Sequence, residues 1–304
     1  MIARKPETQT LGCMIVGGHK CGTTSLKEYL GAHPEVLTHP QLEFTAFSRK
    51  GHSAAGEREQ LDKLLDAAGG RLAMAKHAGV YAEPFALDRL RAATPGCRLL
   101  LILRDPVARA RSAFRMESLM GEAQEPFEQV IARTIEIERQ GRGDWRAHVY
   151  LRMGLYGKWL GEILDRFPAD NVKVLFLEEL HADPAAHYRE CCAWLGIDPG
   201  FSPDLETRHN VGADPRSALL ARSLKRLRSE RNPLKRGARR VLPEAAYLRV
   251  ATLARNANRA SAGEASDEPA PVDRRLREFF AADEEELSRR LGRELPWRAA
   301  RSAP

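Results

Sequence analysis

The residues best suited to chemistry begin with a short glycine-rich segment near the start of the chain. Residues 17–25 read GGHKCGTTS, and Lys20 lies between Gly18 and Gly22. Three hydroxyl side chains follow Gly22: Thr23, Thr24 and Ser25. The apolar run 13–16 precedes the segment and a helical pattern follows it. At such a strand-to-helix turn, backbone N–H groups and the helix dipole converge on one point. The segment therefore predicts a phosphate-binding loop, with a simple tight connection as the alternative.

The position of the lysine distinguishes this loop from those of nucleotide kinases and other P-loop NTPases. A Walker A loop reads GxxxxGK[ST], with the lysine directly after the second glycine. Gly17 and Gly22 have that separation, but Thr23 stands where the lysine belongs, and Lys20 lies two residues before Gly22. A kinase or NTPase stays an alternative, which Mg²⁺-dependent ATP binding would reveal, and the displaced lysine argues against it.

A second motif follows the purely apolar run 99–103. Arg104 leaves this run, and Ser112 lies eight residues further on, in a segment that predicts a helix starting near Pro106. An arginine at the carboxyl end of a strand and a serine in the next helix can bind one dianionic phosphate together. The alternative for Arg104 is an ordinary helix-capping ion pair with Asp105.

Together these motifs resemble those of the sulfotransferases that use 3′-phosphoadenosine 5′-phosphosulfate (PAPS), especially the carbohydrate-type and bacterial members. In that family a lysine two residues before Gly-Thr-Thr marks the 5′-phosphosulfate loop, and an arginine and a serine eight residues apart bind the 3′-phosphate. Residues 155–184 and 276–298 extend the resemblance. It implies PAPS as co-substrate, PAP as product, and eight cofactor-binding residues: Lys20, Cys21, Gly22, Thr23, Thr24, Ser25, Arg104 and Ser112.

The resemblance implies in-line transfer of a sulfuryl group to a hydroxyl or an amine of a glycan, a glycolipid or a natural product. Lys20 is the candidate for stabilising the negative charge that develops on the leaving oxygen. No metal is expected, because the leaving group is already a stabilised phosphate, unlike the Mg²⁺-dependent transfer of a phosphoryl group.

Two residues are candidates for the general base. Glu43 matches a glutamate that serves as base in many carbohydrate-type and bacterial members, although Leu42 stands where a lysine or an acid often precedes it. Apolar neighbours such as Leu42 and Phe44 are expected to desolvate Glu43 and raise its pKa. His77, which titrates near neutrality, loosely resembles the histidine of cytosolic sulfotransferases of small phenols and steroids. Lys76 is expected to contact the acceptor or the sulfate in either case.

Around these motifs the hydrophobic pattern predicts an α/β fold with three layers. Purely apolar strands separated by helices indicate a central parallel sheet with helices on both faces, and the resemblance implies the P-loop-like sulfotransferase fold. Residues 140–148 are polar and are expected to form a loop over the acceptor site. Strands are expected at 13–16, 99–103 and 172–177. Helices are expected at 23–30, 57–68, 87–93, from 106, 127–139, 156–167, 184–195 and 272–291.

Positive charge is concentrated in one segment. The chain of 304 residues has a net charge of +7, and residues 216–259 contain thirteen Lys or Arg against two acidic residues. We expect one domain over residues 1–304, with a basic insertion at about 216–271 and a closing helix at 272–298. Part of the insertion is expected to fold over the cofactor's phosphates or to meet an anionic acceptor or membrane surface; the alternative is a solvated basic helix. No specific nucleic acid is expected; a nucleic-acid or membrane-surface binder is the non-enzymatic alternative.

The compartment is inferred from the cysteines and from hydropathy. Five cysteines without a CxxC spacing argue against a disulfide scaffold or a zinc site, and favour a reducing compartment. No apolar run reaches the eighteen or so residues that cross a bilayer. We therefore expect a soluble, cytoplasmic protein.

Overall fold

A computed structural model describes residues 10–48, 53–120, 122–123, 125–206 and 271–302. The chain divides into two compact units, the first formed by residues 1–106, 152–210 and 280–304 and the second by 107–151 and 211–279. Almost all of the predicted basic insertion lies outside the described residues. The single domain over 1–304 therefore stays a prediction.

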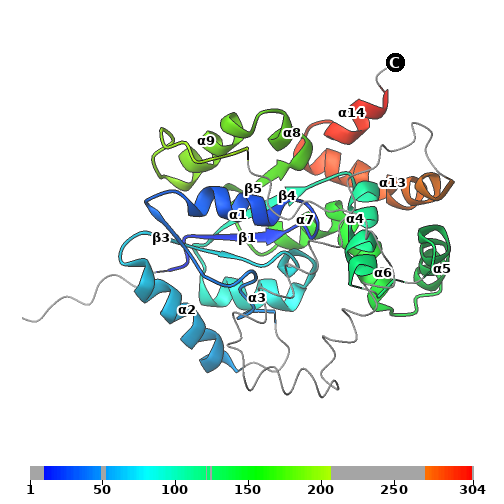
Figure 1. Cartoon of the computed structure of the whole chain (residues 1–304). Coiled ribbons are helices and arrows are strands. Elements are labelled where there is room, and N and C mark those ends of the chain that lie inside the picture. The colour runs from blue at the N-terminus through cyan, green and yellow to red at the C-terminus, as the bar shows by residue number, and fades with distance from the viewer. Residues whose placement is uncertain (1–9, 49–52, 121, 124, 207–270, 303–304) are drawn as a thin grey trace, which may run out of the picture. The chain divides into compact units, whose positions relative to one another are not determined.

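The first unit is built around a parallel sheet of five strands, which confirms the predicted α/β class (Figure 1). In sheet order the strands are β2 (Val36–Thr38), β3 (Leu72–Lys76), β1 (Cys13–Gly17), β4 (Arg98–Leu103) and β5 (Val172–Phe176). The three predicted strands are present as β1, β4 and β5. The other two were missed, because β2 has only three residues and β3 is alanine-containing and ends in a lysine, so neither carries a strong strand pattern.

Helices on both faces of the sheet complete the three layers of the first unit. Figure 1 shows α1 and α9 on one face and α3 on the other. The helices of this unit are α1 (Thr23–Gly31), α2 (Ala54–Ala68), α3 (Pro84–Ala93), α7 (Tyr156–Leu164), α8 (Leu177–Ala182), α9 (Pro184–Leu195) and α14 (Pro296–Ser302).

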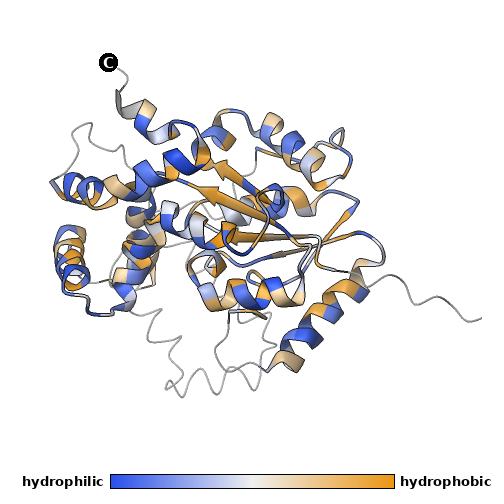
Figure 2. Cartoon of the chain, turned by 180° about the vertical axis from the view of Figure 1, so that it is seen from behind, coloured by the Kyte–Doolittle hydropathy of each residue, from blue (hydrophilic) through white to orange (hydrophobic). Residues whose placement is uncertain are grey.

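The core lies between these layers. The strands are mostly hydrophobic, whereas the helices carry a polar and an apolar side (Figure 2). The end of the chain contributes Trp297, which is buried, packs against Tyr156 and Phe176, and donates a hydrogen bond of 2.9 Å to Glu284. The expected closing helix is α13 (Pro271–Leu291), after which Gly292 turns the chain with a φ of 64°.

Gly17, at the end of β1, packs so closely against a neighbouring side chain that it leaves no room for a Cβ atom. A Cβ atom on Gly17 would lie 2.2 Å from Cδ1 of the buried Tyr81 ring. Tyr81 cannot easily move, because its hydroxyl donates to the carbonyl of Met153. Gly17→Ala is expected to lower the free energy of unfolding by about 3 kcal/mol in chemical denaturation. Gly96→Ala is the control, since nothing lies within 4 Å of its new Cβ atom; equal losses in both variants would contradict the prediction.

In its described residues the second unit contains α4 (Pro106–Leu119) from Val107 onward, α5 (Phe127–Arg139), α6 (Trp145–Tyr150) and the start of α13. The expectation of a loop over residues 140–148 is wrong for its last four residues, because α6 begins at Trp145. Asp144 caps this helix, accepting from the backbone N–H of Arg146 at 3.3 Å. At the other end, the buried Arg109 guanidinium donates to the carbonyls of Val149 and Tyr150.

Among the helices of the described ranges, none has both the length and the apolar character that crossing a membrane requires.

Candidate active site

The sheet brings three predicted site segments to one edge. β1 pairs in parallel with β3 on one side and with β4 on the other, with Ile15 opposite Lys76 and Gly17 opposite Leu101. Because parallel strands end at the same edge, the glycine-rich loop, Lys76 and Arg104 all lie at the carboxyl ends of neighbouring strands. Open α/β sheets bind their ligands at this edge.

The glycine-rich loop is held in a fixed shape by its own backbone. The N–H of Gly18 donates to the carbonyl of Ile102 on β4 at 2.6 Å, and the N–H of Cys21 donates back to Gly18 at 3.1 Å. Lys20 adopts a φ of 66°, the left-handed conformation that side chains rarely take. Such alternation of backbone conformation turns successive N–H groups toward one point, as in other anion-binding loops.

The loop leads into α1 through a glycine that no other residue could replace without strain. Gly22 has a φ of 86°, and a Cβ atom there would lie 2.7 Å from Leu177. As the N-cap of α1 it offers no side-chain hydrogen bond, so the first N–H groups of the nine-residue helix have no side-chain cap. A helix N-terminus without a side-chain cap, the helix dipole and a nearby lysine suit a phosphate or sulfate group.

Cys21 contributes to the loop's own structure. Its side chain is buried, with Sγ 3.5 Å from the hydroxyl of Tyr156, and its amide is bonded to Gly18. Thr23 is also buried, whereas Thr24 points toward the lysine at the end of β3. Thr24 thus connects the loop to Lys76, which in turn contacts the predicted base Glu43.

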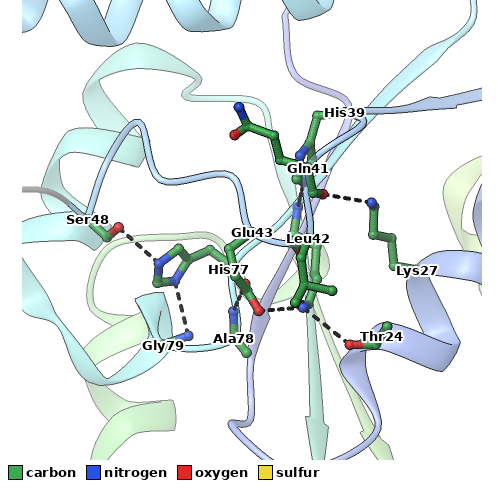
Figure 3. Close-up of polar contacts among 11 residues, drawn as sticks. Thr24, Lys27, His39, Gln41, Leu42, Glu43, Ser48, His77, Ala78 and Gly79 are labelled. Atoms are coloured by element: carbon green, nitrogen blue, oxygen red, sulfur yellow. Dashed lines mark hydrogen bonds and ion pairs between the residues drawn. The ribbon is translucent and has the colours of Figure 1, made fainter. Parts of the chain in front are cut away.

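Glu43 and Lys76 form an ion pair beside the loop (Figure 3). The Lys76 ammonium lies 2.5 Å from Oε1 of Glu43 and 3.5 Å from Oγ1 of Thr24. The second carboxylate oxygen of Glu43 accepts from the N–H of Ala78 at 2.9 Å. Lys76 is 1% exposed and the Glu43 side chain 32% exposed. A buried cation thus connects the phosphate loop to a carboxylate that solvent can reach.

The surroundings of Glu43 differ from the apolar ones expected from its neighbours. Leu42 is 57% exposed, and Phe44 and Phe47 are buried in the core and pack against each other. The groups that contact the carboxylate are the Lys76 ammonium and a backbone N–H. The expectation failed because residues 39–44 form neither a helix nor a strand. In such a segment, neighbours in the sequence need not point their side chains toward one another.

His77 lies directly after β3, but both of its ring nitrogens are engaged. Nδ1 accepts from the N–H of Gly79 at 3.2 Å, which leaves the proton of the neutral ring on Nε2, 3.0 Å from the hydroxyl of Ser48. Burial lowers the pKa of His77. In this arrangement the neutral imidazole has no free lone pair with which to accept a proton.

Two buried basic side chains next to this pair were not recognised as site residues. Lys27 on α1 donates to the carbonyl of Gln41 at 3.0 Å, and Nε2 of His39 accepts from the backbone N–H of Lys76 at 3.2 Å (Figure 3). Both side chains are at most 5% exposed. Only one weak signal could have found Lys27: it lies a helical turn beyond the hydroxyl residues of the loop.

His39 predicts a pH dependence of stability. Burial, and secondarily the Lys27 ammonium, lowers the pKa of His39 from 6.5 to about 4. Between these values the unfolded chain binds a proton that the folded chain does not. The free energy of unfolding should therefore fall by up to about 3 kcal/mol as the pH drops from 6.5 to 4. His39→Gln retains a hydrogen-bond acceptor but does not titrate, so the free energy of unfolding should depend less steeply on pH in this variant, as measured by denaturation at several pH values. The lowered pKa of His77 contributes a dependence of the same sign in the wild type and in the variant. Identical pH dependences in the two proteins would contradict the prediction.

Arg104 follows β4 next to the half-buried carboxyl group of Glu178. Glu178, at the start of α8, accepts from the N–H of Asp105 at 3.0 Å, and burial raises the pKa of Glu178 while the nearby Arg104 opposes this. Glu178 and Glu179 both lie in the first turn of α8. Ser112 lies on α4 in the second unit, so its place relative to Arg104 stays a prediction.

In the described part of the chain, no group of three or more His, Cys, Asp or Glu side chains is arranged to hold a metal ion.

Comparison with known proteins gives concordant matches. A family model described as "Sulfotransferase domain" matches residues 12–210. Mouse heparan sulfate glucosamine 3-O-sulfotransferase 3A1 is 29% identical over 187 residues, which are 60% of this chain and 45% of that protein. Human heparan sulfate glucosamine 3-O-sulfotransferase 6 is 29% identical over 191 residues, 60% of this chain and 52% of that protein. The chain spans about half the length of these curated relatives.

Among solved structures, a sulfotransferase from Alicyclobacillus acidocaldarius is 25% identical. It superposes with a TM-score of 0.63 and covers 93% of this chain and 96% of its own.

Proposed function

Since this chain belongs to the sulfotransferase domain family, we propose that it transfers a sulfuryl group from PAPS to a hydroxyl or an amine of an acceptor. One observation carries the proposal. The Lys76 ammonium lies within hydrogen-bonding distance of Glu43 on one side and of Thr24 in the phosphate loop on the other. A candidate base and a candidate phosphosulfate site are thus joined by a single side chain.

The residues at the sheet edge fit the charge of PAPS. The N-terminus of α1, which has no side-chain cap, and Lys20 would hold the 5′-phosphosulfate, and the N-cap Gly22 has no room for a side chain. Arg104 and Ser112 would hold the 3′-phosphate. When bound, PAPS supplies an activated sulfuryl group attached through a bridging oxygen to the 5′-phosphate.

Residues of the chain would take up the acceptor's proton and stabilise the negative charge that develops on the leaving oxygen. Glu43 takes the proton from the acceptor hydroxyl as the oxygen of that hydroxyl forms a bond to the sulfur of the sulfuryl group. The bond from sulfur to the bridging oxygen breaks, and the electron pair leaves with PAP. Lys20 stabilises the negative charge on that oxygen, while Lys76 orients the Glu43 carboxylate.

Glu43 is the better base of the two candidates. Each oxygen of a carboxylate has two lone pairs, so the bonds to Lys76 and Ala78 leave Glu43 further acceptor capacity. Its partial exposure gives an acceptor access to it. His77 lacks this spare acceptor capacity, since both of its ring nitrogens are engaged within the protein.

The names of the curated relatives support a glycan as the acceptor. A small-molecule acceptor is the second possibility. We also propose that residues 216–259 contact an anionic surface and that the protein is located in the cytoplasm.

The proposal is tested by incubating the protein with ³⁵S-labelled PAPS and a panel of acceptors that includes heparan sulfate and small alcohols and amines. We expect PAP to bind without a metal ion and label to reach at least one acceptor. Failure to bind PAP, together with Mg²⁺-dependent binding of ATP, would favour the NTPase alternative. Binding to RNA or anionic vesicles that is steeply salt-dependent and independent of PAPS would favour a non-enzymatic binder.

A further inference from the structure

Two buried lysines hold consecutive backbone carbonyls just before Glu43. Lys27 donates to the carbonyl of Gln41 at 3.0 Å, and Lys76 donates to the carbonyl of Leu42 at 3.2 Å (Figure 3). Lys27 is 5% exposed and Lys76 is 1% exposed. The two cations come from different elements, α1 and β3, and meet the same short segment.

Besides the two lysine contacts, this segment is held at its start by His39, whose Nε2 accepts from the N–H of Lys76. Residues 39–44 form neither a helix nor a strand, so no regular ladder of hydrogen bonds holds them. The N–H of Phe44 donates to the carbonyl of Lys76, and Lys76 also contacts Glu43 directly. Without Lys27, the part of the segment before Leu42 would lose its link to the helix that begins at the phosphate loop.

Burying an ammonium group is unfavourable unless it is bonded. Burial lowers the pKa of Lys27, and the nearby Lys76 ammonium lowers it further, whereas Glu28 and Glu43 raise it. An apolar side chain would avoid this cost at the same site on α1. The retained lysine therefore indicates a role beyond packing.

We propose that Lys27 is a positioning residue, which holds the Gln41 carbonyl so that the Glu43 carboxylate stays in place beside the phosphate loop. Lys27 acts through the backbone and touches neither donor nor acceptor. This inference rests on the proposed function only for the role of Glu43 as base. The contact by which Lys27 holds the Gln41 carbonyl, called the clamp below, can be tested without turnover.

The first test uses amide hydrogen exchange measured by NMR in Lys27→Met, in which methionine approximates the length of lysine but cannot donate. The N–H of Ala78 reports on Glu43, because it donates to Oε2 of that residue. We expect this amide to exchange at least about tenfold faster, while the amides of β4 are unchanged. Lys63→Met is the control, since Lys63 is 72% exposed and pairs only along its own helix.

Unchanged exchange at Ala78 in Lys27→Met would overturn the clamp. Faster exchange throughout β4 as well would indicate general destabilisation and would also overturn it. Lys27→Leu, a second apolar variant, serves if Lys27→Met does not fold.

The second test is a double-mutant cycle with Glu43→Gln, using ³⁵S-labelled PAPS. Both transfer to heparan sulfate and release of labelled sulfate to water are followed, so that a readout exists without the natural acceptor. We expect Lys27→Met to lower the rate about tenfold in the wild-type background, with PAP affinity within twofold, and to have no further effect in Glu43→Gln.

Equal rate losses in both backgrounds would mean that Lys27 does not act through Glu43. If the wild-type protein binds no PAP and turns over no PAPS, the proposed function fails, and the exchange experiment still decides the clamp.

Discussion

Replacing Glu43 with glutamine is expected to lower kcat about 1,000-fold, with little change in the affinity for PAP. General-base catalysis contributes roughly 10²–10⁴-fold to rate, and the amide of glutamine cannot take the acceptor's proton. Its one oxygen can still accept from Lys76 or from the N–H of Ala78, so the segment keeps part of its support. The loss should therefore fall on the chemical step and leave the phosphate loop intact.

The measurement is the initial rate of ³⁵S transfer at saturating PAPS, with PAP binding followed by calorimetry. His77→Asn is the matched variant, because asparagine can keep the hydrogen bond with the Gly79 amide. We expect it to lose less than about fivefold. A large loss in His77→Asn beside a small one in Glu43→Gln would make His77 the base and would refute the proton path proposed above.

Lys20→Met is expected to lower kcat/KM for PAPS about 1,000-fold. Removing one preorganised group that stabilises developing charge costs roughly 10²–10³ in rate, and the ground-state attraction to the phosphosulfate is lost as well. The affinity for PAP should fall less than kcat/KM, because the 3′-phosphate contacts proposed for Arg104 and Ser112 do not involve Lys20.

Steady-state kinetics with varied PAPS and direct PAP titration separate these two effects. Lys63→Met removes an equal charge from an exposed position on α2 and should change neither quantity by more than about twofold. An effect of Lys20→Met no larger than that of Lys63→Met would mean that the loop does not hold the phosphosulfate.

The loop and the sheet illustrate what local pattern can predict. The spacing of Gly17, Lys20 and Gly22 and the apolar run before it were sufficient to predict a strand, an anion-binding turn and a helix. The purely apolar β4 was likewise predicted to be a strand buried on both faces. In each case the signal lies within about ten residues, and short-range sterics and burial decide the outcome.

β3 shows where this kind of inference fails. Its sequence, LAMAK, carries neither strict alternation nor β-branched residues, and it becomes a strand because β1 and β2 lie on either side of it. Tertiary context overrides weak local preference in such a strand. Missing β3 also hid the fact that Lys76 ends a central strand, with its side chain directed at the phosphate loop.

The sequence by itself determined the family resemblance, the α/β class and the candidates Lys20, Glu43, Lys76, His77 and Arg104. Only the tertiary structure decided how these residues contact one another. It paired Glu43 with Lys76, 33 positions apart in the sequence, engaged both nitrogens of His77, and joined Lys27 to the segment that carries the candidate base Glu43. The physical reason is that ion pairs and backbone clamps between distant segments depend on which strands pair and where side chains point, and neither leaves a periodic trace in the sequence.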